Sequence, residues 1–232
     1  MFKYINMKSE IKKIFREPIM ALLFLAPILI TVIFKLMFVL LVPFIQRYVS
    51  FDMALYQHYV LAFTMIMSSS LLSMVMGFMM IDDRDNKIVE LMSVTPMGKS
   101  GYLFMRLSLV FMFVFIYSIY TYFFMGIYIL PFGTLLYLSL LLCLYSAVMG
   151  LLLFSVASDK VSALTYAKGL NVVFLFAFVD LLNIKWLNIL AAFFPPYWVT
   201  QIIADPQNIF ALVMGAVVCL GWLIIMLRRA KI

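Results

Sequence analysis

Lys35 and Asp180 are the residues of this sequence that most clearly could do chemistry, because each interrupts a long apolar stretch. A charged side chain within lipid is costly, so such residues are functional candidates and tend to face a partner. Two interpretations stay open for the pair. Lys35 and Asp180 form an intramembrane ion pair, or each side chain extends separately to the outer headgroups, which both can reach.

The histidine and the cysteines do not form a pattern typical of a metal or catalytic site. His58 is the only histidine and has no cysteine or carboxylate pair at ligand spacing, whereas Cys143 and Cys219 both lie inside apolar runs. The HExxH and GxSxG patterns are also absent from the sequence. We therefore expect no catalytic residue, no resident metal and no cofactor.

The tripeptide Gly98-Lys99-Ser100 ends like a phosphate-binding loop. The full pattern requires a glycine where Ser93 stands, a strand before the loop and a soluble helix after it. Pro96 and an apolar run surround the tripeptide instead. We expect no nucleotide site in this chain.

An acidic run precedes that tripeptide and contains Asp82, Asp83 and Asp85, with Glu90 following. A calcium loop is disfavoured because Lys87 breaks its pattern and the turn has no glycine. Acidic side chains favour a helix N-terminus. The run is interpreted as the solvated start of a helix.

The residues after the acidic run have helical spacing. Ile88, Leu91, Met92 and Thr95 occupy positions i, i+3, i+4 and i+7, and Pro96 then stops the pattern. This spacing predicts a short amphipathic helix. The helix either rests on the headgroups or docks a cytoplasmic partner.

The composition indicates an integral membrane protein. Hydrophobic residues make up 67% of the chain and charged residues 12%, and the mean hydropathy is +1.14. A soluble domain is about 45–50% apolar and about 25% charged. In a soluble protein the net charge of +7 would favour nucleic acid as a partner. In a membrane protein the basic residues instead indicate which connections face the cytoplasm. Nucleic acid is not an expected partner, and no second domain fits.

The fold class that we predict is all-α and polytopic, a single transmembrane domain over residues 1–232. An amphipathic interfacial helix covers residues 1–18, the longest cytoplasmic connection covers 82–101, and an outer connection over 183–207 forms a partly re-entrant or interfacial cap. Spans need about 20 apolar residues. Six are predicted, over residues 19–42, 59–81, 103–128, 132–157, 161–182 and 208–227.

Basic residues predict the orientation. They concentrate in the N-terminal segment, in the loop region that includes Arg84 and Arg106, in the turn at Lys160 and in the C-terminal tail, whereas Arg47 and Lys185 fall on the other side. Lysine and arginine are enriched in cytoplasmic connections. Both termini should be cytoplasmic.

Small residues recur every four positions in two of the spans. Ser69, Ser73 and Gly77 do so in the second span, and Ser146 and Gly150 in the fourth. Such spacing lets helix backbones approach closely. The residues either pack spans within the chain or line a path between subunits.

The order of these parts resembles the permease subunits of ABC exporters of the type-2 class. The specific match covers Ile81 to Arg106, where an acidic run leads into a short helix ending in Thr95-Pro96, and the stretch from Phe194 to Trp198 is similar to the segment before the last span. Within that class the chain looks closest to small permeases for drug export, including fluoroquinolone export.

The resemblance implies a half-transporter of the bacterial cell membrane. Two permease chains, identical or different, would form the pathway for a hydrophobic or amphipathic drug or peptide, and separate ABC ATPase subunits would hydrolyse ATP. Residues Met1 to Arg16 would be the interfacial elbow helix. The contact with the ATPase would use Ile88, Glu90, Leu91, Met92, Thr95 and Pro96. An intramembrane enzyme, a small channel and a membrane-bound immunity or scaffold protein are the alternatives.

Overall fold

The computed structural model describes residues 7–48, 53–95 and 98–229, which contain helices and no strand. This confirms the all-α fold class. Residues 1–6 of the predicted elbow helix and Pro96 of the predicted coupling set lie outside the described residues. The α-helices are α1 (Met7–Arg16), α2 (Pro18–Gln46), α3 (Gln57–Asp85), α4 (Ile88–Ser93), α5 (Gly98–Met125), α6 (Phe132–Val156), α7 (Lys160–Leu170), α8 (Lys185–Ala191), α9 (Pro195–Ala204) and α10 (Ile209–Arg229), and the 3₁₀-helices are η1 (Met53–Tyr56) and η2 (Asn171–Leu182).

Six helices of the described chain are long and apolar enough to cross a membrane. They are α2, α3, α5, α6, the rod that α7 and η2 form together, and α10, and they correspond to the six spans predicted from the sequence. The fifth span differs from the expectation in one respect. Its second half is a 3₁₀-helix of 12 residues, much longer than the 3–4 residues at which such helices ordinarily end.

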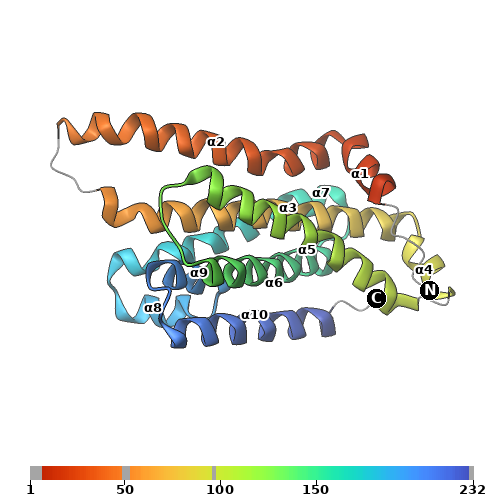
Figure 1. Ribbon diagram of the computed structural model, residues 1–232. Coiled ribbons are helices and arrows are strands. Elements are labelled where there is room, and N and C mark those ends of the chain that lie inside the picture. The colour runs from red at the N-terminus through yellow and green to blue at the C-terminus, as the bar shows by residue number, and fades with distance from the viewer. Residues whose placement is uncertain (1–6, 49–52, 96–97, 230–232) are drawn as a thin grey trace.

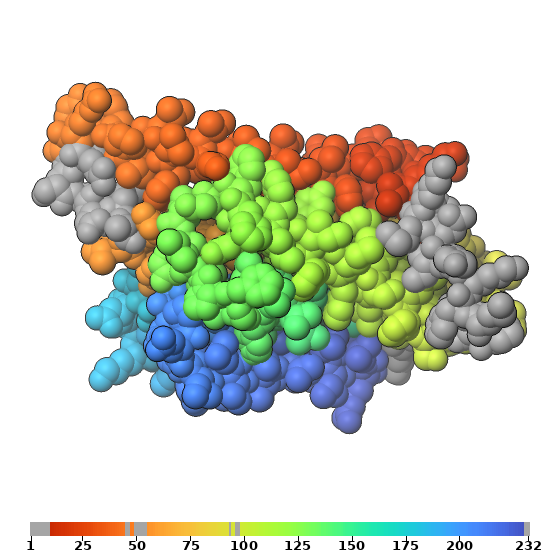
Figure 2. All heavy atoms as spheres, viewed as in Figure 1, coloured from red at the N-terminus to blue at the C-terminus, as the bar shows by residue number. Residues whose placement is uncertain are grey.

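The six spans do not share the interior equally. In their most apolar stretches, 83% of the residues of α3 and 72% of those of α6 are buried, against 11% in α2. Figure 1 shows α2 and α10 at opposite edges of the bundle, and Figure 2 shows α5, in green, across the face between them. α3 and α6 therefore form the core, while α2 turns most of its apolar surface outward, as a lipid-facing helix does.

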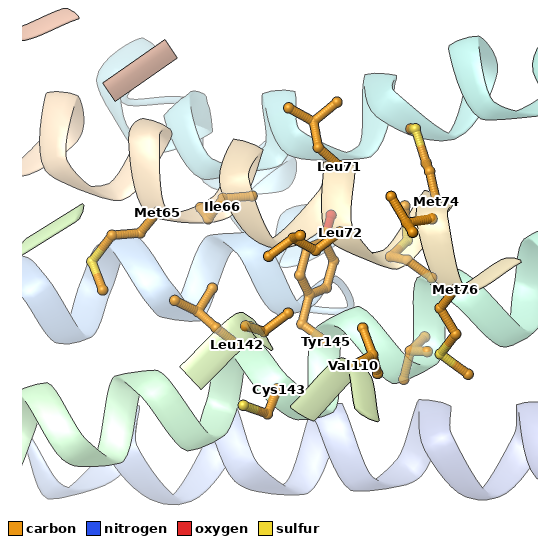
Figure 3. Packing of buried hydrophobic residues seen from close by; sticks show 14 of the residues in the cluster. Met65, Ile66, Leu71, Leu72, Met74, Met76, Val110, Leu142, Cys143 and Tyr145 are labelled. Carbon is orange, nitrogen blue, oxygen red and sulfur yellow. The ribbon is translucent and has the colours of Figure 1, made fainter. Parts of the chain in front are cut away.

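Small side chains bring α3 and α6 together. A Cβ atom added to Gly150 would lie 3.0 Å from the Ser73 carbonyl oxygen, and the Ser69 hydroxyl donates to the Leu142 carbonyl at 2.9 Å. In Figure 3, Leu142 and Tyr145 of α6 point toward α3. For these residues the structure supports the interpretation of packing within the chain.

The outer connection folds into two helices, α8 and α9, and the chain bends by 111° between them. α9 starts at Pro195, which suits the first helical position because its missing N–H needs no partner there. The indole N–H of Trp198 donates to the Ala192 carbonyl at 2.7 Å, which closes the bend. α9 is largely buried, whereas α8 is mostly exposed. The bent pair is compatible with a broken span or a re-entrant loop, and the partly re-entrant or interfacial cap stays a prediction.

α1 and α4 lie at one end of the bundle, and α8 lies at the other (Figure 1). We call the first the α4 end; it also contains the C-terminal turn of α3 and the start of α7, which are joined there by the ion pair between Asp82 and Lys160. The connections with most lysines and arginines meet at this end. That it faces the cytoplasm is the prediction from those basic residues.

Candidate functional site

The helix at the centre of the candidate site is α4, held between two residues with left-handed backbone. Lys87 precedes it with φ +57°, and Gly98 follows with φ +62°. The Thr95 hydroxyl donates to the Met92 carbonyl at 2.7 Å and so occupies a carbonyl at the end of the helix. The sequence correctly predicts a short helix in this position.

The two faces of α4 differ from the predicted apolar stripe. Val89 and Met92 are partly buried against the core of the chain, whereas Leu91 is 64% and Val94 is 84% exposed. Ile88 is half-buried, and Glu90 and Thr95 are exposed. The stripe therefore splits, because α4 uses one apolar side to pack on α3 and α5. The apolar surface available to a partner consists of Leu91 and Val94.

Behind α4, Arg106 and Asp83 form a buried ion pair between α5 and α3, with 3% and 2% of their side chains exposed. Arg106 Nε donates to an Asp83 carboxylate oxygen at 2.9 Å, and the Tyr102 hydroxyl donates to the same oxygen at 2.9 Å. Arg106 Nη1 donates to Glu10 of α1 at 2.5 Å. One guanidinium thus connects α1, α3 and α5.

This network corrects the interpretation of the acidic run as a solvated helix start. Asp82, Asp83 and Asp85 close α3 instead of opening a helix. Carboxylates are unfavourable at a helix C-terminus, so they require cations. Asp83 obtains one from Arg106, which the sequence assigns to the basic loop region but which lies inside α5.

A second ion-pair cluster links α7 to α3. Lys160 Nζ lies 2.7 Å from Glu17, in the junction between α1 and α2, and 2.8 Å from Asp82 of α3. About a third of each of the three side chains is exposed. This cluster is therefore closer to water than the one around Arg106.

The cap of α7 positions Lys160. Asp159 precedes α7 and accepts a hydrogen bond at 2.7 Å from the backbone N–H of Ser162. This bond, together with the Ser162 hydroxyl, lowers the pKa of Asp159 below its ordinary value. The cap fixes where α7 begins, and so where the Lys160 side chain starts.

Arg84 joins α3 to α6. Its Nη2 donates to the carbonyls of Ala157 and Ser158 at 2.9 and 2.7 Å, just past the end of α6. Its guanidinium also lies 5.2 Å from the centre of the Phe154 ring. Asp82 therefore contacts α7, Asp83 contacts α5, and Arg84 contacts the end of α6. Together they fix the C-terminal turn of α3, which α4 follows.

Lys35 and Asp180 have separate partners. Lys35 Nζ donates at 2.5 Å to the carbonyl of Phe124, one of the last carbonyls of α5, where a helix favours a cation. Asp180 accepts hydrogen bonds from Tyr59 at 3.5 Å and from Asn188 at 3.3 Å. The structure describes both residues and contains no ion pair between them.

Sequence reasoning missed Glu10, Glu17, Arg106 and Lys160 as parts of the site. One signal was available: Glu10 and Glu17 are the acidic residues of an otherwise basic N-terminal segment. Their partners were not evident, because Glu10 and Arg106 lie 96 residues apart in the chain. Within the residues that the structure describes, no three His, Cys, Asp or Glu side chains gather as a metal site would require.

Comparison with known proteins covers almost the whole chain. Residues 10–227 match the family described as fluoroquinolones export permease protein Rv2686c-like. Two similar proteins are the fluoroquinolones export permease proteins MT2760 and Rv2686c of Mycobacterium tuberculosis, strains CDC 1551 / Oshkosh and H37Rv. Each is 25% identical over 238 residues, spanning 97% of this chain and 92% of the relative. No solved structure matches the chain.

The family match and the fold agree. The matched residues begin at Glu10 in α1 and end at Leu227 in α10, so they include the Arg106 network, α4 and all six apolar helices. The family's description, its relatives' names and these helices show a multi-pass membrane transport protein. This chain belongs to the Rv2686c-like family of fluoroquinolone export permeases.

Proposed function

We propose that this chain is the membrane-spanning subunit of an ATP-driven exporter of the ABC type in the bacterial plasma membrane. Two permease chains form the pathway, and separate ATPase subunits drive it from the cytoplasmic side, where the α4 end and both termini lie. The ATPase reaction belongs to the partner, not to this chain.

The observation that carries this proposal is the exposed apolar surface of Leu91 and Val94 at α4, a helix that packs against the core of the chain. Leu91 and Val94 are 64% and 84% exposed, while Val89 and Met92 attach the same helix to the core. A soluble ATPase can move membrane helices only through a contact outside the bilayer. α4, at the end of the bundle in Figure 1, supplies an apolar contact backed by a rigid frame.

The names of the relatives support the proposed substrate class. They are named for fluoroquinolone export, and we extend this to hydrophobic or amphipathic compounds of that kind for this chain. The apolar walls of the spans, rich in methionine and phenylalanine, suit ligands of varied shape.

Leu91→Asp tests the coupling contact. A carboxylate in an apolar contact costs on the order of several kcal/mol when it has no partner. We expect normal amounts of membrane-embedded protein, loss of ATPase co-purification and at least a tenfold loss of ATP-dependent fluoroquinolone uptake into inverted vesicles. The vesicles contain this chain together with the ABC ATPase that co-purifies with the wild type.

Val161→Asp is the matched control. Val161 is 75% exposed and lies in the first turn of α7 at the α4 end, where a carboxylate favours the helix N-terminus. This variant should keep both the ATPase and transport. Full coupling in Leu91→Asp contradicts the assignment of α4, and uptake that needs no nucleotide in the wild type favours the channel alternative. A wild type that binds no ATPase and transports nothing favours the scaffold alternative.

A further inference from the structure

The α4 end contains a cavity of about 460 Å³ whose walls include α1, α3 and α4. Six charged side chains line it: Lys13, Arg16, Glu17, Asp82, Asp83 and Arg106. Its volume lies within the range of about 300–1,000 Å³ typical of sites for small ligands. A group larger than a few water molecules fits here.

The acidic lining residues are already paired. Asp83 accepts from Arg106, and both Glu17 and Asp82 bind Lys160. The basic residues of α1 are held less firmly. Lys13 Nζ forms two long ion pairs, 3.8 Å from Glu10 and 3.8 Å from Asp83, and Arg16 makes no hydrogen bond or ion pair with the residues that the structure describes. Arg16 therefore offers an unpaired cation to the cavity, beside a loosely paired Lys13, and a ligand that pairs with it is an anion.

Lys13 and Arg16 are placed to bind one anionic group together. They are three residues apart on α1 and therefore share a face of the helix. Both are exposed, so they line the open side of the cavity, while Ile14 beside them is 1% exposed and packs into the core. A guanidinium binds phosphate oxygens through two parallel N–H groups, which favours phosphate as the anion.

The remaining wall is apolar and indicates which phosphate compound fits. Met20, Met79 and Ile88 line the same cavity. Met20 and Met79 are only 3% and 4% exposed, whereas Ile88 is half-buried. The glycerol part of a lipid would cover the exposed surface of Ile88, which an inorganic phosphate would leave in contact with water. The neighbouring apolar space between α2, α3 and α5 holds only about 10 Å³, so the acyl chains stay in the leaflet.

We propose that this cavity binds the headgroup of a membrane glycerophospholipid, with its phosphate on Lys13 and Arg16 and its glycerol against Met20 and Met79. α1 is an amphipathic helix of the kind that lies at the membrane surface, which places its cations at the level of lipid phosphates. Because Ile88 belongs to α4, the lipid bridges α1 and α4 and sets the position of the exposed Leu91 and Val94.

The test measures lipid binding by the full purified chain after removal of native lipid. Native mass spectrometry follows titration with dioleoyl phosphatidylglycerol, with dioleoylglycerol as the probe that lacks phosphate. We expect one tightly bound phosphatidylglycerol in the wild type and at least tenfold weaker binding in K13Q/R16Q. Lys12→Gln is the matched control, because Lys12 is exposed on the same helix but does not line the cavity.

A second variant separates charge from shape. Ile88→Trp narrows the cavity without changing its charge and should also weaken phosphatidylglycerol binding. Equal affinity in K13Q/R16Q and Lys12→Gln, or equal binding of dioleoylglycerol, overturns the proposal. Displacement of the lipid by inorganic phosphate at the same concentration, with Ile88→Trp unaffected, identifies a simple anion site and overturns the lipid assignment.

Discussion

Arg106 and Lys160 bind carboxylates at the α4 end of the molecule, whereas Lys35 and Asp180, toward the opposite end, bind neutral partners. Arg106 binds Glu10 and Asp83 across three helices. Lys35, by contrast, rests on a backbone carbonyl and on the ring of Phe124, and Asp180 accepts long hydrogen bonds from neutral groups. The two ends therefore hold their helices by different means.

The difference predicts which end resists separation of its helices. Removing one member of a buried ion pair leaves an uncompensated charge, so the helices joined by Arg106 separate only at high cost. A lysine on a carbonyl can exchange that carbonyl for a water molecule or a headgroup at lower cost. We infer that the α4 end moves as one body, and that the opposite end rearranges more readily.

Arg106→Gln is expected to have the largest effect. It removes the buried cation of Asp83 and Glu10 and leaves only the more distant Lys13, 3.8 Å from each, which costs about 3–5 kcal/mol of stability. Thermal unfolding of the detergent-purified protein measures the loss. The triple variant with Glu10→Gln and Asp83→Asn should recover part of it, because no unpaired carboxylate remains. An unchanged unfolding temperature in Arg106→Gln would show that this network does not hold the α4 end.

Lys160→Gln is expected to have a smaller effect that depends on salt. Lys160, Glu17 and Asp82 are each about a third exposed, so the loss should be about 1 kcal/mol or less. At 1 M salt the Debye length falls to about 3 Å, and the difference from the wild type should shrink. The deficit of Arg106→Gln should persist under the same conditions. If both deficits respond equally to salt, the two clusters are not distinguished by burial.

Lys35→Gln and Asp180→Asn should show the smallest coupling. Because the two residues have separate partners, the effects on unfolding should add within about 0.5 kcal/mol in a double-mutant cycle. Unfolding temperatures of the two single variants and the double variant measure this term. A coupling energy well above that limit would restore the ion pair and would make the two ends of the molecule alike.

The length and periodicity of the apolar runs were sufficient to predict six spans and a short helix from Ile88 to Thr95, which in the structure ends at Ser93. These features are local, since bilayer thickness sets the length of a span and side-chain spacing sets the face of a helix. The bend before α9 was also foreseeable, because Pro195 and Pro196 follow a stretch rich in turn formers and interfacial aromatics.

Sequence alone determined the fold class, the spans and the place of α4, because each depends on neighbouring residues. Only the tertiary structure decided that Asp83 is buried on Arg106, that Met92 packs inward while Leu91 faces out, and that Lys35 binds a carbonyl of α5. A charge within a bundle takes whichever partner the packing of distant helices brings to it. The partners of Arg106 lie 23 and 96 residues away along the chain, beyond the reach of any local pattern.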